Sequence, residues 1–247
     1  MGLERDSMVG IRRALALLIL GFYVTQFAMT AWLGPGEMAT AYAGLALTYC
    51  LAFVALAAEW FWARWFAIGL GNFGALLLLV LVKVGFEPLI AFFGFTHLAV
   101  SVFLMGEGMA ARYEHSEYAR ERWNLHEESV ALLRRAIKSA GSTLPFLILY
   151  ALAPRPEFQQ VGALALGAAG LFGLVRGRTW GVFALGAAGA TALADGVGLF
   201  GDPAIGYLLL HPQGAPMVYG PVVGLLAGGL LLVPMAFAGP MVRWVRG

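Results

Sequence analysis

The sequence predicts an all-α integral membrane protein with eight transmembrane helices. Hydrophobic residues make up 60% of the 247 positions and charged residues only 12%, about half the charged share of an average soluble domain. Apolar segments of about 20 residues, the length that crosses the hydrocarbon layer as a helix, recur along the chain. The Lys and Arg residues collect in alternate connections between these segments, as the positive-inside rule requires.

The eight segments differ in how well each fits a membrane span. The first follows Arg12 and Arg13 and is longer than the core of a typical secretory signal. The fifth is the weakest, because it contains Lys138 and Pro145 and reaches only roughly 26 Å at the helical rise. The expected spans are 14–33, 39–61, 65–84, 88–105, 137–153, 159–175, 179–199 and 217–238.

The basic residues predict the orientation of the chain. If the N-terminus is cytoplasmic, then all of the 16 Lys and Arg residues except Lys83 and Arg155 fall on the cytoplasmic side. Such a bias is typical of membrane proteins. We therefore expect both termini in the cytoplasm, a topology that suits a bacterial inner membrane.

Two stretches of the chain resemble each other. Arg-Arg-Ala stands at 12–14 and again at 134–136, and the turns GPGE at 34–37 and PRPE at 154–157 follow. This pattern predicts two four-span halves, 1–105 and 140–247, which would be parallel repeats about an axis along the membrane normal. The alternative is that charge topology and helix-breaking residues alone produce the same order.

The segment 106–139 between the halves is predicted to form a cytoplasmic helical hairpin. It contains no proline and is rich in Ala, Glu, Arg and Leu, which favour a helix. Asn124 followed by Glu127 is typical of a helix start, and span four is expected to continue as a helix to about Trp123. Either the hairpin docks a protein partner, or it is a solvated linker whose aromatic residues rest on headgroups. The docking candidates are Tyr113, Tyr118, Trp123, Arg134 and Arg135.

A few polar residues lie inside the apolar segments, where they are costly and therefore mark candidate functional positions. His97 is a candidate proton relay or haem ligand, and the alternative is an interhelical hydrogen bond. Asp195 is a candidate cation ligand or a carboxylate that reaches water. Glu59 is expected to pair with Arg64. The intramembrane polar candidates are Gln26, Asn72, His97 and Asp195.

Small residues distinguish the second half of the chain. LGAAG occurs at 166–170 and at 185–189, and Gly220, Gly224 and Gly228 follow at four-residue spacing. Small residues at such spacing allow helix backbones to approach closely in lipid. The last three segments are therefore predicted to pack tightly together.

The sequence lacks the common motifs of catalysis and cofactor binding. A phosphate loop, a dinucleotide-binding glycine pattern and a His-Glu-x-x-His metal site are absent. The single cysteine, Cys50, excludes an intramolecular disulfide, and the scattered basic residues do not form the patch of a nucleic-acid-binding protein. No catalytic residue, metal site or cofactor is predicted.

Three functions are compatible with these observations. The first is a non-catalytic scaffold or anchor subunit of a larger membrane complex, with the lipid bilayer and other proteins as partners. The second is a small-solute or ion transporter or channel whose path lies between the two halves. The third is a membrane-embedded enzyme. Convergence of the four intramembrane polar residues on one path would favour transport.

Overall fold

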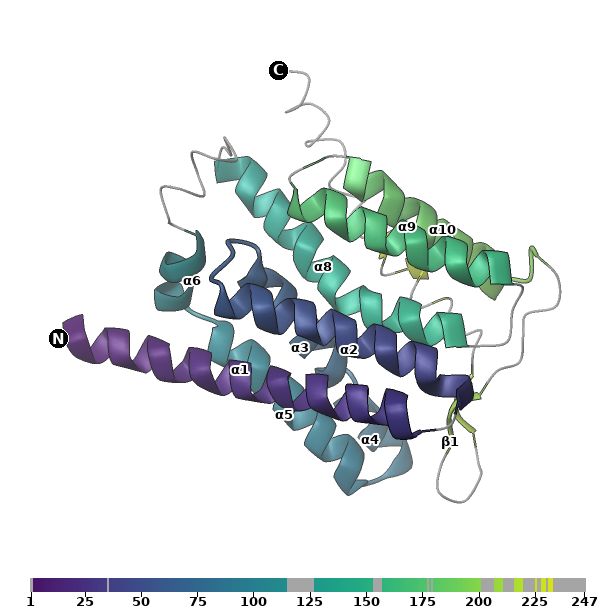
Figure 1. The fold of residues 1–247 in the computed structure, drawn as a ribbon, viewed down its shortest axis with the longest axis horizontal. Helices are drawn as coiled ribbons and strands as arrows, with labels where there is room; N and C mark the ends of the chain where they lie inside the picture. The colour runs from purple at the N-terminus through teal and green to yellow at the C-terminus, as the bar shows by residue number, and fades with distance from the viewer. Residues whose placement is uncertain are drawn as a thin grey trace. The chain divides into compact units, whose positions relative to one another are not determined.

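The computed structural model describes most of the chain as helix, with one short antiparallel hairpin (Figure 1). It divides into two compact units, Met1–His126 (unit 1) and Glu127–Gly247 (unit 2), and their boundary falls inside the 106–139 segment. We describe each unit by itself. The residues described are 2–34, 36–114, 127–152, 157–176, 178, 180–200, 207–210, 216–219, 225, 228–229 and 231–232.

Unit 1 is a bundle in which one long helix packs along two others. Helix α1 contacts both α2 and α5, and α3 packs against α5 and α2. Helix α5 begins at Pro88, where the Glu87 carboxylate accepts a hydrogen bond from the Ile90 amide at 2.8 Å and caps the helix. The helices are α1 (Gly2–Leu33), α2 (Gly36–Ala57), α3 (Ala63–Ala75), α4 (Leu78–Val84), α5 (Pro88–Leu104) and α6 (Glu107–Glu114).

The core of unit 1 combines large aromatic side chains with two glycines of α3. Tyr49, Trp65 and Phe66 are among its largest fully buried side chains. A Cβ atom at Gly71 would meet the Ser101 side chain, and one at Gly74 would meet the His97 ring. The absence of side chains at these two positions therefore lets α5 approach α3.

Unit 2 contains three consecutive helices in contact and a hairpin. Helix α8 packs against α9, and α9 packs against α10. Strands β1 and β2 pair in an antiparallel manner. The elements are α8 (Glu127–Leu152), α9 (Glu157–Val175), α10 (Trp180–Gly196), β1 (Tyr207–Leu210) and β2 (Pro216–Tyr219).

The prediction of eight membrane spans is wrong. Among the described helices, only the stretch Met8–Leu33 of α1 is by itself long and apolar enough to cross a membrane. Helices α5 and α6 reach the length of an apolar span only if they are counted as one helix. They are bent by 73° at the break between them. The described residues therefore offer one candidate span, or two if the bent pair counts as one. Among the described residues, more than two membrane spans are not supported, and the two four-span repeats that depended on eight spans are wrong too.

The expected spans fail for identifiable reasons. The segment 65–84 is interrupted, because α3 and α4 are separated by a turn in which the Leu77 amide donates to the Gly74 carbonyl at 3.1 Å. The apolar parts of α2 and α9 cover only Tyr42–Ala57 and Val161–Val175. Helix α10 has 17 residues. The expected span 217–238 starts within strand β2 and continues largely outside the described residues.

The expected continuation of span four as a helix to Trp123 is also wrong. Helix α5 ends at Leu104, and Gly106 has a φ of 99°, a left-handed conformation that glycine adopts without steric cost. Helix α6 then starts in a new direction. The remainder of the expected hairpin up to His126 lies outside the described residues.

Candidate functional site

The first polar cluster of unit 1 is centred on His97 of α5, which is only 1% exposed. The Tyr49 hydroxyl of α2 lies 2.6 Å from His97 Nε2, and His97 Nδ1 lies 2.8 Å from the Phe93 carbonyl oxygen. Because a carbonyl only accepts, Nδ1 carries a proton, and Nε2 can accept from the Tyr49 hydroxyl. Both ring nitrogens are thus occupied by protein groups.

Aromatic rings enclose this imidazole. The Phe93 ring stacks on it with centroids 4.0 Å apart, and the Tyr23 ring of α1 lies with its centroid at 4.3 Å. The Tyr23 hydroxyl is 2.6 Å from Thr96 Oγ1 of α5. The histidine cluster, defined as Tyr23, Tyr49, Phe93, Thr96 and His97, therefore joins α1, α2 and α5 by hydrogen bonds among closely packed rings.

The structure brings two of the four polar candidates to one helix interface. Asn72 Oδ1 accepts a hydrogen bond from Ser101 Oγ at 3.1 Å, and Ser101 lies one turn beyond His97 on α5. Gln26 lies at an exposed position of α1, whereas Asp195 is buried in α10 of unit 2. Asn72 and His97 therefore share the contact between α3 and α5, and Gln26 faces outward.

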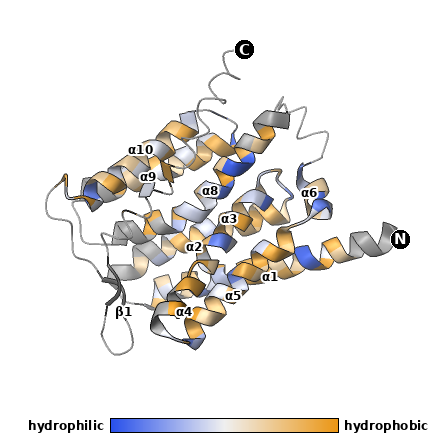
Figure 2. Cartoon of the chain, turned by 180° about the vertical axis from the view of Figure 1, so that it is seen from behind, coloured by the Kyte–Doolittle hydropathy of each residue, from blue (hydrophilic) through white to orange (hydrophobic). Residues whose placement is uncertain are grey.

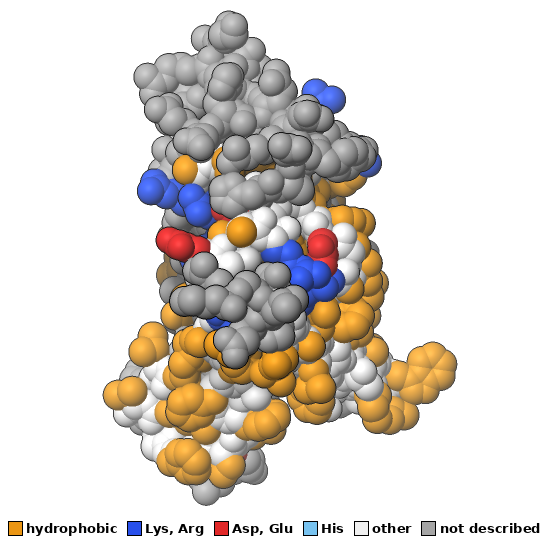
Figure 3. Space-filling view, turned by 90° about the vertical axis from the view of Figure 1, so that its left-hand side faces the viewer, with side chains coloured by type: hydrophobic (Ala, Val, Ile, Leu, Met, Phe, Trp, Pro, Cys, Tyr) orange, Lys and Arg blue, Asp and Glu red, His pale blue; other side chains and the backbone are white. Residues whose placement is uncertain are grey.

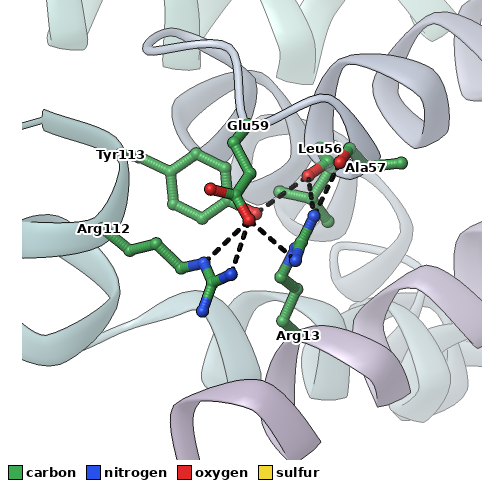
Figure 4. Close-up of polar contacts among 6 residues, drawn as sticks. All are labelled: Arg13, Leu56, Ala57, Glu59, Arg112 and Tyr113. Atoms are coloured by element: carbon green, nitrogen blue, oxygen red, sulfur yellow. Dashed lines mark hydrogen bonds and ion pairs between the residues drawn. The ribbon is translucent and has the colours of Figure 1, made fainter. Parts of the chain in front are cut away.

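The second cluster joins the first half of α1, the end of α2 and helix α6 (Figure 4). Glu59 Oε1 accepts from Arg13 Nη1 at 2.8 Å and from Arg112 Nη2 at 2.6 Å. The expected ion pair of Glu59 with Arg64 is wrong, because Arg64 pairs with Glu114 of α6. We call Arg12, Arg13, Glu59, Arg64, Arg112, Tyr113 and Glu114 the arginine clasp.

Three guanidinium groups of the arginine clasp bind carbonyl oxygens at helix C-termini. Arg13 Nη2 donates to the Ala57 carbonyl at 2.6 Å. Arg12 Nη2 donates to the Val102 carbonyl at 2.9 Å, and Arg64 Nε to the Leu104 carbonyl at 2.8 Å. The last carbonyls of a helix lack intrahelical partners and carry the negative end of its dipole. The arginines therefore stabilise the ends of α2 and α5.

Glu59 occupies a backbone position that usually holds glycine. Its φ is 57°, a left-handed conformation that costs a residue with a Cβ atom roughly 1–2 kcal/mol. The Trp60 amide donates to the Ala55 carbonyl at 3.0 Å and the Glu59 amide to the Leu56 carbonyl at 3.4 Å, the pattern of a Schellman helix end. The ion pairs with Arg13 and Arg112 provide a reason for a glutamate here.

Helix α6 is held against the rest of unit 1 by the same cluster. The buried Tyr113 donates its hydroxyl hydrogen to the Leu56 carbonyl at 3.0 Å, and Trp65 Nε1 donates to Glu114 at 2.7 Å. Burial raises the pKa of Tyr113 above its usual value, so the hydroxyl stays a donor at neutral pH.

The docking candidates are placed very differently. Tyr113 is buried inside unit 1, as described above. Arg134 and Arg135 lie at exposed positions of α8 in unit 2. Tyr118 and Trp123 lie outside the described residues.

The sequence singled out His97 and Asn72 but missed the residues that bind His97 and cap the helices. Tyr23 and Tyr49 each carry a hydroxyl near the middle of an apolar segment, the one signal in the sequence that could have marked them. Arg12 and Arg13 were read as topology signals. The three-dimensional structure is needed to see that they lie beside the C-termini of α2 and α5, because no spacing in the sequence indicates it.

Comparison with known proteins adds no relative. No protein-family model matches the chain, and no curated protein or solved structure gives a significant match. Within the described residues, no group of three or more His, Cys, Asp or Glu side chains is arranged to hold a metal ion.

Proposed function

We propose that this chain is a non-catalytic anchor or scaffold subunit of a membrane complex, with α1 as the membrane anchor. The observation that carries this proposal is the apolar stretch Met8–Leu33 of α1, which is 26 residues long. Figure 2 shows that the coloured part of α1 is mostly hydrophobic, with one hydrophilic band in its N-terminal half. A helix of this length and composition suits the hydrocarbon layer.

The exposed face of α1 supports an anchor over the core helix of a soluble protein. Leu18 is 70% exposed and Trp32 is 87% exposed. On the face drawn in Figure 3, which includes more than α1, hydrophobic side chains are the most widespread of the coloured kinds. Full burial of one such side chain is worth about 1.5–3 kcal/mol. This face is therefore expected to be covered by an apolar medium or partner. Its other large exposed hydrophobic residues are Met8, Ile11, Leu15, Phe22, Met29 and Leu33, and the polar Thr25 and Gln26 are exposed among them.

The basic residues at the start of the apolar stretch indicate its orientation. Arg12 and Arg13 stand near the N-terminal end of Met8–Leu33, and Lys and Arg favour the cytoplasmic side. In this proposal the N-terminal end of α1 and the arginine clasp lie at the cytoplasmic surface. The same placement puts the clasp where other subunits of an inner-membrane complex can reach it.

The buried polar residues favour a scaffold over a transporter. His97 uses both ring nitrogens in bonds to Tyr49 and Phe93, and Asn72 accepts from Ser101. Polar side chains that bind a passing solute must exchange partners, whereas these bonds hold helices together. Within unit 1, this polar set thus serves packing.

The test is purification of the tagged full-length chain in nanodiscs, followed by mass spectrometry of bound proteins. An anchor or scaffold subunit is expected to retain at least one partner in stoichiometric amount. A matched pair of variants locates the contact: Arg135→Glu alters an exposed position of α8, and Arg178→Glu alters an exposed position in the turn before α10. Recovery of the chain only alone or as a homo-oligomer would contradict the scaffold function and would call for solute-flux assays.

A further inference from the structure

We infer that α5 lies in the lipid bilayer beside α1, and that α6 turns away from it along the headgroup layer. This inference rests on the proposed anchor function of α1 and extends it to a second helix. It concerns the bent helix pair that qualifies as a candidate span only when α5 and α6 are taken together.

The two faces of α5 have the polarity expected in lipid. Every exposed position of this helix is apolar, and the large ones include Phe95 at 59% exposure. The buried face carries His97 and Ser101 together with Gly94. Soluble proteins place their polar residues outside, whereas helices in lipid turn them toward other helices. The exposed residues of α5 are Pro88, Leu89, Phe92, Phe95, Leu98 and Val102.

The exposed faces of α5 and α1 form one continuous surface. Phe22 of α1 contacts Phe92 of α5 edge to face, with ring centroids 6.0 Å apart, and both side chains are about half exposed. Hydrocarbon that covers Phe22 on the anchor therefore also reaches Phe92 on α5.

The two helices also share a boundary. Arg12 near the start of the anchor stretch donates to the carbonyls of Val102 and Met105 at the end of α5. From Arg12, the anchor extends to Leu33 over roughly 32 Å, and the 17 residues of α5 extend over roughly 26 Å. Both lengths are close to the hydrocarbon thickness of about 30 Å. The antiparallel helices thus reach the same membrane surface at Arg12.

Helix α6 begins where this boundary lies. It departs from α5 at 73°, so it runs nearly along the membrane plane if α5 follows the normal. It buries Met109 and Tyr113 and exposes Ala111 and Arg112. Its buried face packs on the rest of unit 1, and its exposed Arg112 can interact with headgroup phosphates.

The composition of the α5 face favours lipid chains over a protein as its occupant. Interfaces between proteins carry a polar rim and about one hydrogen bond per 100–200 Å². The exposed positions of α5 supply no side-chain donor or acceptor along the whole helix. A purely apolar surface that continues the anchor is matched by acyl chains.

The test uses single cysteines in a Cys50→Ala background, with the full-length chain in vesicles of phosphatidylcholine and phosphatidylglycerol. The variants are Leu18→Cys on α1, Phe95→Cys on α5 and Ala111→Cys on α6, all at exposed positions. A charged maleimide is expected to react with Ala111→Cys at least ~10-fold faster than with the other two, because the reactive thiolate is disfavoured in hydrocarbon. Denaturing detergent should abolish the difference.

The outcomes separate this inference from the anchor proposal. If Leu18→Cys is protected while Phe95→Cys reacts as fast as Ala111→Cys, then α5 lies outside the bilayer and the anchor stands. If Leu18→Cys and Phe95→Cys both react rapidly, then both proposals fail.

A spin label at Phe95→Cys identifies what covers the face. Contact with lipid predicts strong relaxation of the label by oxygen, which partitions into hydrocarbon, and weak relaxation by an aqueous nickel chelate. Weak relaxation by both reagents would reveal a protein partner on this face and would overturn the inference. An Ala111→Cys label, expected to respond to the nickel chelate, is the control.

Discussion

Unit 1 and unit 2 hold their helices together in different ways. Among α1, α2 and α5 of unit 1, side chains make hydrogen bonds between helices: the Tyr49 hydroxyl binds His97, and Arg13 binds the end of α2. Between α9 and α10 of unit 2, backbones come into contact: a Cβ atom at Gly173 would lie 2.7 Å from Gly181 Cα, and one at Gly181 would lie 2.6 Å from the Gly170 carbonyl oxygen.

The difference predicts different sensitivities to substitution. When one hydrogen bond between side chains is lost, the neighbouring side chains can adjust, because they keep other partners. Two backbones in contact have no side chain to move aside, so one added methyl group separates the helices. A methyl group added where α9 and α10 touch should therefore destabilise the protein more than a hydroxyl removed from unit 1.

The largest effect is expected for Gly181→Ala in α10. Its added Cβ atom would overlap the backbone of α9, and we expect a loss of about 2–3 kcal/mol in the free energy of unfolding. Denaturant unfolding followed by circular dichroism measures it. Gly162→Ala in α9 is the matched control, because nothing lies within 4 Å of the added atom. The α9–α10 contact would not depend on glycine if both variants were equally stable.

An intermediate effect is expected for Tyr49→Phe. The substitution leaves His97 Nε2 buried without the Tyr49 hydroxyl, at a cost of about 1–3 kcal/mol. Tyr23→Phe should cost less, because Thr96 Oγ1 still donates to the Phe92 carbonyl at 2.7 Å. The same unfolding assay compares the two variants. If both variants lost the same free energy of unfolding, the Tyr49–His97 hydrogen bond would contribute no more than the Tyr23–Thr96 bond.

The smallest effect is expected for Arg112→Gln in the arginine clasp. Arg112 is 38% exposed beside Glu59, whereas Arg13 is 19% exposed and also caps α2. Exposed ion pairs contribute about 0–1 kcal/mol and weaken with salt. Arg13→Gln should therefore destabilise unit 1 more than Arg112→Gln, and less of its effect should vanish at high salt. If Arg112→Gln destabilised unit 1 more than Arg13→Gln, the hydrogen bond of Arg13 to the end of α2 would not contribute to stability.

The sequence predicted where helices lie better than which of them could span a membrane. The apolar segments at 88–105 and 159–175 correspond closely to α5 and α9, since each is bounded by proline or glycine and charged residues. Close packing through small residues is confirmed between α9 and α10, and for Gly228 against Gly189. The number of spans was wrong, because apolar composition was counted without the break after Ala75 or the shortness of the apolar parts of α2 and α9.

The site was predictable only in part. His97 stood out as a polar residue in an apolar segment, but its partner Tyr49 is 48 residues away. Only the packing of both α2 and α5 against α1 brings them together. Glu59 and Arg64 are near neighbours in sequence. The left-handed backbone at Glu59 directs its carboxylate to Arg13 and Arg112 instead.

The central claim is that α1 anchors the chain in a membrane, and alkaline carbonate extraction of membranes containing the full-length chain tests it most directly. The chain is expected to stay in the pellet, and Leu18→Glu should weaken that retention while Ala111→Glu on α6 should not. Quantitative release of the unaltered chain into the supernatant would contradict the anchor.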